Sequence, residues 1–258
     1  MSNTVKKNVN IIKIDQLSSD IFSMWLQDST IAAAAKPGQF VSLYCKDGSR
    51  LLPRPISICE IDQERGAIRL VYRVVGKGTK EFSNLQAGDS IEVMGPLGNG
   101  FTLEGKKAIL IGGGIGIPPM LQLSKELKAM GVQVQVVLGY RDELFLNEEF
   151  TQFGEVYIST EDGSTGTKGN VIDAIKEKEL TADIIFSCGP TPMLRGVKAY
   201  AMEQGIKAQI SMEEKMACGI GACLACVCKS KEKDHHTNVN NKRICKDGPV
   251  FYCEEVEL

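Results

Sequence analysis

Six of the nine cysteines of this 258-residue chain lie close to its C-terminal end, and their spacing constrains the fold more than any other feature. Three of them, Cys218, Cys223 and Cys226, follow the pattern C-x-x-x-x-C-x-x-C, the spacing with which thiolates hold a [2Fe-2S] cluster. Such a loop must turn its backbone N–H groups towards the sulfides, and Gly219 and Gly221 permit the positive φ angles that this requires. The sequence therefore predicts a cluster-binding loop. The alternatives are zinc and a few buried free thiols, but the two paired C-x-x-C motifs that are usual in a zinc ribbon are absent.

The fourth ligand has three candidates, which are Cys228, Cys245 and Cys253. Cys228 follows Cys226 too closely to reach the far iron. Cys245 comes after a polar stretch long enough for a hairpin and precedes a turn at Asp247-Gly248-Pro249 that can return the chain to the cluster. We therefore expect Cys245 to be the fourth ligand. A Rieske-type site would place two histidines on one iron, but three close cysteines exceed the two it needs, so His235 and His236 are assigned to a solvated hairpin tip.

Composition and charge exclude several classes of function. With 30 Lys and Arg against 32 Asp and Glu, the formal net charge is -2, which offers no basic surface for nucleic acid. The longest apolar run, residues 108–121, is shorter than the about 20 residues that span a bilayer, and Gly and Pro interrupt it. The N-terminus lacks the apolar core of a secretory signal, so we expect a cytoplasmic protein. In that reducing compartment, clustered cysteines indicate metal or redox chemistry rather than disulfides.

The hydrophobic pattern divides the chain into three predicted parts. Residues 1–103 alternate short β-type runs with turn signals, which favours an antiparallel barrel or sandwich. Residues 104–211 alternate strand-like with helix-like runs, which is typical of a parallel sheet covered on both faces. Residues 212–258 are rich in cysteine and then polar, and show neither a helical nor a strand period. We expect this last part to be too small for its own hydrophobic core and to depend on metal for its fold.

Two glycine-containing turns of the second part have the character of a dinucleotide site. The first joins a predicted strand to a helix that begins at Pro118, and it contains Gly112, Gly113, Gly114 and Gly116. Such a turn presents N–H groups to a pyrophosphate, although Ile117 replaces the third glycine of the usual fingerprint. The second turn contains Cys188, Gly189 and Pro190 at the carboxyl end of a later strand. Ligands of open parallel sheets bind at the carboxyl ends, so both turns are expected to bind one nucleotide; tight turns without a ligand are the alternative.

A third group of residues lies in the barrel-like part. Arg54, Pro55, Ile56 and Ser57 follow one another on a predicted strand, and an Arg next to a small hydroxyl residue can hold a phosphate beside a flat ring. Tyr72 and Arg73 lie on a second strand, and Gly78 and Thr79 open a short helix whose N–H groups suit an anion. Surface salt bridges and an ordinary turn are the alternative interpretation.

Together these motifs resemble the ferredoxin-reductase superfamily over nearly the whole chain. The resemblance implies an FAD-binding β-barrel in residues 1–103, an NAD-binding α/β domain in 104–211 and a [2Fe-2S] module in 212–258. It implies that Arg54 contacts the FAD pyrophosphate and Ser57 the flavin ring, and that the two glycine turns bind the nicotinamide dinucleotide. It also implies further flavin contacts from Val71, Tyr72, Arg73, Gly78 and Thr79. Ile56 stands where many members carry an aromatic residue that stacks on the flavin.

The segments RPIS, MACGIGACLACVCK and ICKDGPVF resemble one subgroup closely, the electron-transfer subunits of class 1B NAD-dependent dihydroorotate dehydrogenases. This resemblance implies the ligands Cys218, Cys223, Cys226 and Cys245, and leaves Cys228 and Cys253 as buried thiols. It implies a heterotetramer with a catalytic, FMN-containing subunit that oxidises dihydroorotate in pyrimidine biosynthesis. Electrons would pass from FMN through the cluster and FAD to NAD⁺, and no residue of this chain is expected to act as a catalytic acid or base.

Three other functions are consistent with parts of the pattern. One is the FAD/[2Fe-2S] subunit of a ferredoxin:NADP oxidoreductase or sulfide dehydrogenase, whose cluster loops typically read MCGGC. Another is a flavin enzyme with structural zinc, and a third is a redox sensor with exposed thiols. The choice between NAD and NADP depends on residues near Tyr140, Arg141 and Asp142, and the resemblance favours NAD.

Overall fold

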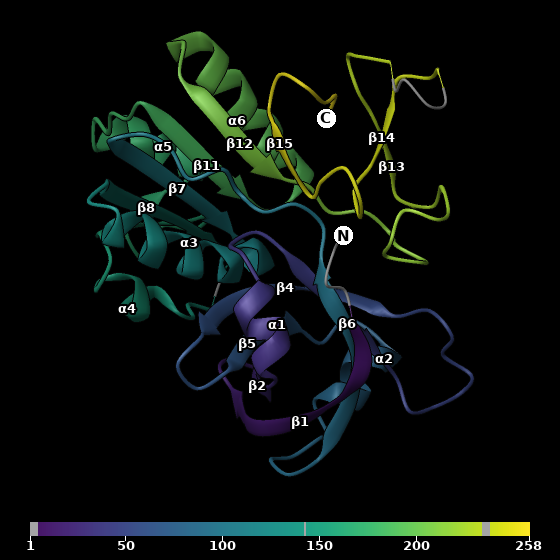
Figure 1. Cartoon of the computed structure of the whole chain (residues 1–258). Helices are drawn as coiled ribbons and strands as arrows, with labels where there is room; N and C mark the ends of the chain where they lie inside the picture. Colours follow the sequence, from purple (N-terminus) through teal and green to yellow (C-terminus); the bar gives the residue numbers. More distant parts are fainter. Residues whose placement is uncertain (1–4, 142, 234–237) are drawn as a thin grey trace.

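The N-terminal part is a closed barrel of six antiparallel strands, in the order β1-β2-β5-β4-β3-β6, which confirms the predicted barrel. The computed structural model describes residues 5–141, 143–233 and 238–258. The strands of the barrel are β1 (Val5–Gln16), β2 (Ile21–Gln27), β3 (Phe40–Tyr44), β4 (Arg54–Asp62), β5 (Ala67–Arg73) and β6 (Ser90–Leu97), with helices α1 (Ser29–Ala34) and α2 (Lys77–Phe82). In Figure 1 the barrel lies at the bottom, in purple and blue.

Strand alternation divides the barrel residues between two cores. On β5, Ile68, Leu70 and Tyr72 point into the barrel and are fully buried there. Val71, on the opposite face, packs with Ile117 in a second apolar cluster that belongs to the α/β part. The barrel therefore has an inner core of its own and an outer face that is also buried.

The second part is a seven-stranded sheet in the order β10-β9-β8-β7-β11-β12-β15. Its parallel strands are β7 (Lys107–Gly113), β8 (Gln133–Tyr140), β9 (Glu155–Thr160), β10 (Thr167–Lys168), β11 (Ile184–Cys188) and β12 (Lys207–Ser211). Helix α3 (Pro118–Ala129) and the short α4 (Asn147–Phe150) cover one face, and α5 (Val171–Glu177) and α6 (Thr191–Gln204) cover the other. Both faces are thus covered by helices, as predicted, and the 3-10 turn η1 (Gly114–Gly116) leads into α3.

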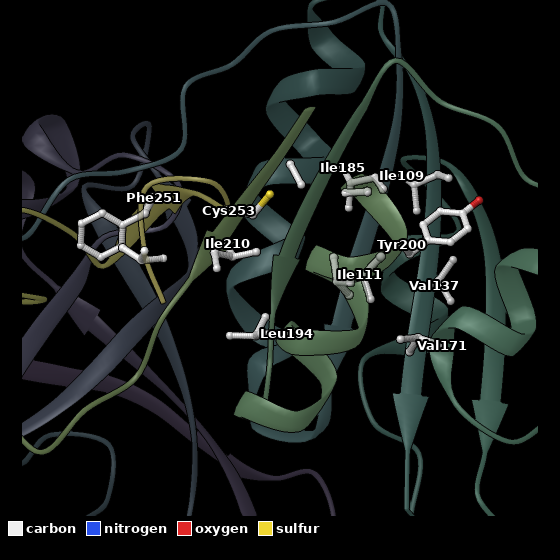
Figure 2. Close-up of a cluster of buried hydrophobic side chains, with 14 of the residues drawn as sticks. Ile109, Ile111, Val137, Val171, Ile185, Leu194, Tyr200, Ile210, Phe251 and Cys253 are labelled. Atoms are coloured by element: carbon white, nitrogen blue, oxygen red, sulfur yellow. The ribbon is translucent and has the colours of Figure 1, made fainter. Parts of the chain in front are cut away.

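Residues 212–258 show no strand period in the sequence, although a hairpin was expected before Cys245, and the structure has three short strands here. This part forms β13 (Val227–Lys229), β14 (Asn241–Arg243) and β15 (Val250–Tyr252), and β15 pairs antiparallel with β12 at the edge of the large sheet. Each strand has only three residues, too few for a period of two to be visible in the sequence. Figure 2 shows Phe251 and Cys253 of this segment beside Ile210, so the cysteine-rich part shares the core of the sheet instead of lacking one.

Outside the cysteine-rich part, three short elements were not predicted: α1, α4 and β10. Helix α1 has a recognisable start, because Asp28 Oδ1 accepts a hydrogen bond from the Ile31 N–H at 2.9 Å. No helix within the described part of the chain is long and apolar enough to span a membrane.

The barrel contacts both other parts of the chain. Phe40 and Leu97, on its outer face, belong to the same apolar cluster as the C-terminal residues Cys226 and Cys245. The Asn99 N–H donates to the Gly248 carbonyl oxygen at 2.7 Å. This packing places the cysteine-rich loop directly against the barrel.

Candidate functional site

The cysteine loop brings four thiols together as two pairs. The Sγ atoms of Cys223 and Cys218 lie 3.3 Å apart, and the Cys245 N–H points at the Cys226 Sγ at 3.5 Å. Backbone N–H groups also point at the sulfurs, with Gly221 N 3.1 Å from Cys245 Sγ and Cys223 N 3.4 Å from Cys218 Sγ. Within the described residues, no three Cys, His, Asp or Glu side chains converge on a single metal position. The observed arrangement is therefore two adjacent pairs of sulfurs inside a cage of N–H donors.

Two glycines allow this loop to close. Gly219 has φ of +71° and Gly221 has φ of +82°, both in the left-handed region that residues with a Cβ disfavour. A Cβ on Gly221 would lie 2.6 Å from the Lys246 side chain, and one on Gly219 would lie 3.0 Å from the Ser42 Oγ. The loop thus needs glycine at both positions for its backbone conformation and for its close packing.

The two thiol pairs differ in burial and in acidity. Cys226 and Cys245 are 1% and 2% exposed, whereas Cys218 and Cys223 are partly exposed. Burial alone would raise the pKa of the Cys218 thiol, but hydrogen bonds from the N–H groups of Cys223 and Ile220 outweigh it and lower the pKa to about 6. Burial, together with the neighbouring Cys226, raises the pKa of Cys245 to about 12. Because thiolates are the metal-binding form, a cage of N–H donors around paired sulfurs fits an iron–sulfur cluster.

The other two C-terminal cysteines lie apart from these pairs. Cys253 is buried in the core beside Ile210, and burial raises the pKa of its thiol to about 11. Cys228, on β13, is also buried, and burial raises its pKa as well. Both therefore have the surroundings of neutral core thiols. His235 and His236 lie outside the described residues.

The predicted flavin strand lies on an opened edge of the barrel. The hydrogen-bonded register between β4 and β5 ends at Ile58 and Leu70. Beyond this point residues 54–57 pair with β3, and residues 71–73 pair with β2. Residues 54–57 are all half-buried, unlike the closed strands around them. Two strand edges therefore diverge here, and their backbone groups can hydrogen-bond a flat heteroaromatic ring.

Arg54 lies directly over the start of α2. A Cβ built on Gly78 would be 2.2 Å from the Arg54 Nε and 2.7 Å from its Cζ, so only glycine accommodates the guanidinium there. Thr79 braces the preceding turn, because its Oγ1 accepts from the Val75 and Gly76 N–H groups at 3.0 and 3.2 Å. A guanidinium held over the backbone N–H groups of a helix start is a suitable cradle for a pyrophosphate.

Tyr72 and Arg73 point to opposite sides of β5. The Tyr72 ring lies inside the barrel, stacked against Phe22 and edge-on to Phe82, and its buried hydroxyl has no partner among the described residues. Burial raises the pKa of Tyr72. Arg73 pairs with Asp20 at 3.0 Å on the outside. The backbone of residues 71–73 therefore lies at the diverging edge, whereas the Tyr72 ring lies inside the barrel.

The two glycine turns of the α/β part meet at the carboxyl end of the sheet. Gly112 and Cys188 are register partners on the parallel strands β7 and β11. A Cβ on Gly116 would lie 2.3 Å from the Cys188 carbonyl oxygen, and one on Gly113 would lie 2.4 Å from the Met193 Sδ. Gly114 has φ of +51°, and a Cβ there would meet nothing within 4 Å. The two turns are thus closely packed on each other, and the surface at Gly114 is open.

Burial keeps the Cys188 thiol of the second turn protonated. Burial, together with the charge of Glu213, raises the pKa of the Cys188 thiol to about 12, so this cysteine is a neutral thiol at physiological pH. Arg141 is exposed at the end of the neighbouring strand, and Asp142, the other residue considered for NAD selection, lies outside the described residues.

The cysteine loop and the flavin strand are neighbours across β3. Ser42, which lies against Gly219, is the register partner of Pro55 on β4 and of Met94 on β6. Ser42 is not among the site residues predicted from the sequence. The signal for it in the sequence is a polar residue within the apolar run FVSLY. In the structure this residue is 1% exposed.

Models of three protein families match consecutive parts of the chain. They describe an oxidoreductase FAD-binding domain at residues 8–101, an oxidoreductase NAD-binding domain at 110–199 and the iron–sulfur cluster binding domain of dihydroorotate dehydrogenase B at 213–257. The chain therefore has a domain for each of FAD, NAD and an iron–sulfur cluster.

Similar proteins extend over the full length. A protein of Fusobacterium nucleatum named "Dihydroorotate dehydrogenase B (NAD(+)), electron transfer subunit" is 44% identical, over 99% of this chain and 97% of its own. A Bacillus cereus protein of the same name is 43% identical, over 98% and 99%. A solved structure of an NADH-dependent reduced ferredoxin-NADP oxidoreductase superposes with a TM-score of 0.87 at 33% identity, over 96% of this chain and 89% of that chain.

Proposed function

The chain belongs to the family of electron-transfer subunits of dihydroorotate dehydrogenase B (NAD⁺), as its resemblance implied, and we propose how its parts carry the electrons. Electrons leave the FMN of a catalytic subunit that oxidises dihydroorotate, cross a [2Fe-2S] cluster and FAD in this chain, and reduce NAD⁺. The chain is thus the oxidoreductase component that returns electrons from a step of pyrimidine biosynthesis to the nicotinamide pool.

One observation carries this proposal: the cysteine loop packs on β3, the strand next to the flavin segment of β4. On the other side of β4, Val71 of β5 belongs to the same apolar cluster as Ile117, which follows the first glycine turn. The flavin segment therefore lies between the two other sites. When bound there, a flavin exchanges electrons singly with a cluster and in pairs with a nicotinamide.

The cluster ligands are proposed as two pairs, one to each iron. Cys218 and Cys223, whose sulfurs are 3.3 Å apart, would hold the outer iron, and the buried Cys226 and Cys245 would hold the inner iron. The surrounding N–H donors stabilise negative charge on the sulfurs, which favours the thiolates over the thiols. Cys228 and Cys253 are left out of the ligand set because neither sulfur belongs to the two close pairs.

The FAD and NAD contacts follow the same local chemistry. Arg54 over Gly78 would neutralise the FAD pyrophosphate, and Ser57 with the diverging edges of β4 and β5 would hydrogen-bond the flavin ring. Gly112, Gly113, Gly114 and Gly116, with Cys188, Gly189 and Pro190, would seat the NAD pyrophosphate and present the nicotinamide to the flavin.

The partner is proposed to bind over the outer thiol pair. Ile220 and Leu224 flank these cysteines and are 52% and 67% exposed, although they are apolar. A protein surface of this kind, next to the group that must accept electrons, suits the catalytic subunit, in a heterotetramer with two copies of each chain. None of the nine cysteines, all of which the structure describes, forms a disulfide, which suits a reducing cytoplasm.

A second candidate function has its own support, because the similar ferredoxin-NADP oxidoreductase structure covers almost the whole chain. An anaerobic visible spectrum of the purified chain, with quantified iron, sulfide and flavin, tests what the two functions share. Each chain should contain about two irons and one FAD, and NADH should bleach the visible absorption of the cluster and of the flavin. Zinc without sulfide would refute the proposal. NAD⁺ reduction by dihydroorotate with the catalytic subunit separates the functions, since the second candidate would show none.

A further inference from the structure

Ser42 carries a buried hydroxyl whose hydrogen-bonding capacity is unused. The residue is 1% exposed, and within the described residues its Oγ has no hydrogen-bond partner. Buried polar groups in folded proteins are almost always hydrogen-bonded, so an orphan hydroxyl indicates a partner that is not part of the polypeptide.

The hydroxyl faces the cysteine loop rather than the barrel interior. Val41 and Leu43, the neighbours of Ser42 along β3, point into the barrel core, so Ser42 points outwards. The nearest heavy atom to a Cβ built on Gly219 is Ser42 Oγ, at 3.0 Å. The next nearest atoms to that Cβ are methyl carbons of Leu97 and Met94, at 3.5 and 3.8 Å, so Ser42 Oγ is the polar atom among the three nearest to Gly219.

The same loop already directs its own donors inwards. N–H groups from residues 221, 223 and 245 point at sulfurs, and they approach from the loop and from the C-terminal turn. Ser42 is a donor on the remaining side, where the loop rests on the barrel. A hydroxyl here can therefore complete the ring of donors around the cluster.

We infer that Ser42 donates a hydrogen bond from Oγ to a sulfur of the [2Fe-2S] cluster and thereby raises its reduction potential. The inference rests on the cluster ligands given under the proposed function. One-electron reduction adds negative charge to the cluster, and a hydrogen-bond donor stabilises the more negative state. Ser42 is a positioning residue in this scheme, because it tunes the cluster without exchanging electrons.

The test is an EPR-monitored redox titration of the cluster in the holoprotein, compared between wild type and Ser42→Ala. We expect the variant to keep its full iron content but to be reduced at a more negative potential. A tenfold change in the reduction equilibrium corresponds to 59 mV for a one-electron couple, and a shift of about this size is expected. Ser42→Thr, which keeps the hydroxyl, should restore the wild-type potential.

A matched control is Ser159→Ala. Ser159 also has a buried hydroxyl without a partner among the described residues, but it lies on β9, far across the sheet from β12 and β15. Its loss should leave the cluster potential unchanged. The iron and sulfide content of the holoprotein is the second readout, and Ser42→Ala should retain both, since the hydroxyl has no protein partner to lose.

The outcomes separate this inference from the proposed function. If wild-type protein holds no iron–sulfur cluster, the proposed function fails first. If the cluster is present and Ser42→Ala leaves its potential unchanged, the inference alone is wrong. A shift confined to the flavin potential would also overturn it, because the hydroxyl would then belong to the flavin site.

Discussion

The guanidinium of Arg69, on β5 of the barrel, forms a two-point ion pair with the carboxylate of Glu149 on α4 of the α/β part. Arg69 Nη1 lies 2.5 Å from Glu149 Oε2, and Nη2 lies 3.1 Å from Oε1. The Arg69 side chain is only 9% exposed, and its Nε donates to the Ser23 Oγ at 2.8 Å. This ion pair joins the barrel to the α/β part. Val71, on the same strand as Arg69, belongs to the apolar cluster of the α/β part.

Glu149→Gln should therefore loosen the junction between the two parts. Glu149 is 39% exposed and Glu60 remains 3.6 Å from Arg69, so we expect a loss of only about 1–2 kcal/mol in unfolding free energy. Urea denaturation measures it. Lys13→Gln is the control, since it removes the exposed Lys13–Asp15 pair and should change stability by less than about 0.5 kcal/mol. Equal effects of the two variants would contradict the role of Arg69 and Glu149.

Gly116→Ala should impair the nucleotide site without removing FAD. The new Cβ would lie 2.3 Å from the Cys188 carbonyl oxygen, so one of the two turns must move. Overpacking of this kind costs about 1–3 kcal/mol, and we expect a higher KM for NADH with unchanged flavin content. Gly48→Ala is the matched control, because a Cβ there meets nothing within 4 Å. An unchanged KM in steady-state kinetics would argue against these turns as the NADH site.

Gly78→Ala should lower the FAD content of the purified chain. Alanine is normally the better helix residue, but here its Cβ would lie 2.2 Å from Arg54 Nε and displace the guanidinium. Flavin released on denaturation, counted per chain, should fall several-fold. Lys80→Ala, at an exposed position on the same helix, should retain FAD. If Gly78→Ala keeps its flavin, Arg54 does not bind the pyrophosphate in its present position.

Cys226→Ser and Cys245→Ser should abolish the cluster, whereas Cys253→Ala should not. The first two remove buried sulfurs from the N–H cage, and the third leaves a small cavity beside Ile210. Iron and sulfide analysis checks the ligands, and unfolding should show a loss of about 1 kcal/mol for Cys253→Ala. Loss of iron in Cys253→Ala would mean that the ligand set is wrong.

Periodicity predicted those parts of the fold in which each element is long enough to show it. The helix beginning at Pro118 and the strands around it appear as expected, because apolar residues repeat over 12 residues in α3. The strand β15 has three residues and depends on pairing with β12, a long-range contact that no local pattern records. The separate C-terminal module was expected for that reason, although its core is shared.

The site residues, like the strands and helices, could be predicted where the signal is local in the sequence and not where it depends on long-range packing. The spacing of Cys218, Cys223 and Cys226 is local, and so are the glycine turns, so their residue types were visible in the sequence. Ser42 depends on the packing of the cysteine loop against a strand far away in the chain, and only the structure reveals it. The inward orientation of the Tyr72 ring is equally a product of barrel closure.

Ile220→Ser combined with Leu224→Ser should weaken binding of the catalytic subunit while leaving the chain's own redox chemistry intact. Both side chains are more than half exposed, so replacing them removes apolar surface from the proposed interface and nothing from the core. Loss of apolar contacts near the centre of an interface costs about 2 kcal/mol or more, which is over tenfold in Kd. Isothermal titration with the catalytic subunit measures this, and reduction of ferricyanide by NADH should stay at the wild-type rate. Met202→Ser is the matched control, because Met202 is 61% exposed on α6 and belongs to no proposed site. Unchanged affinity in the double variant, with full cluster content, would place the partner on another face of the molecule.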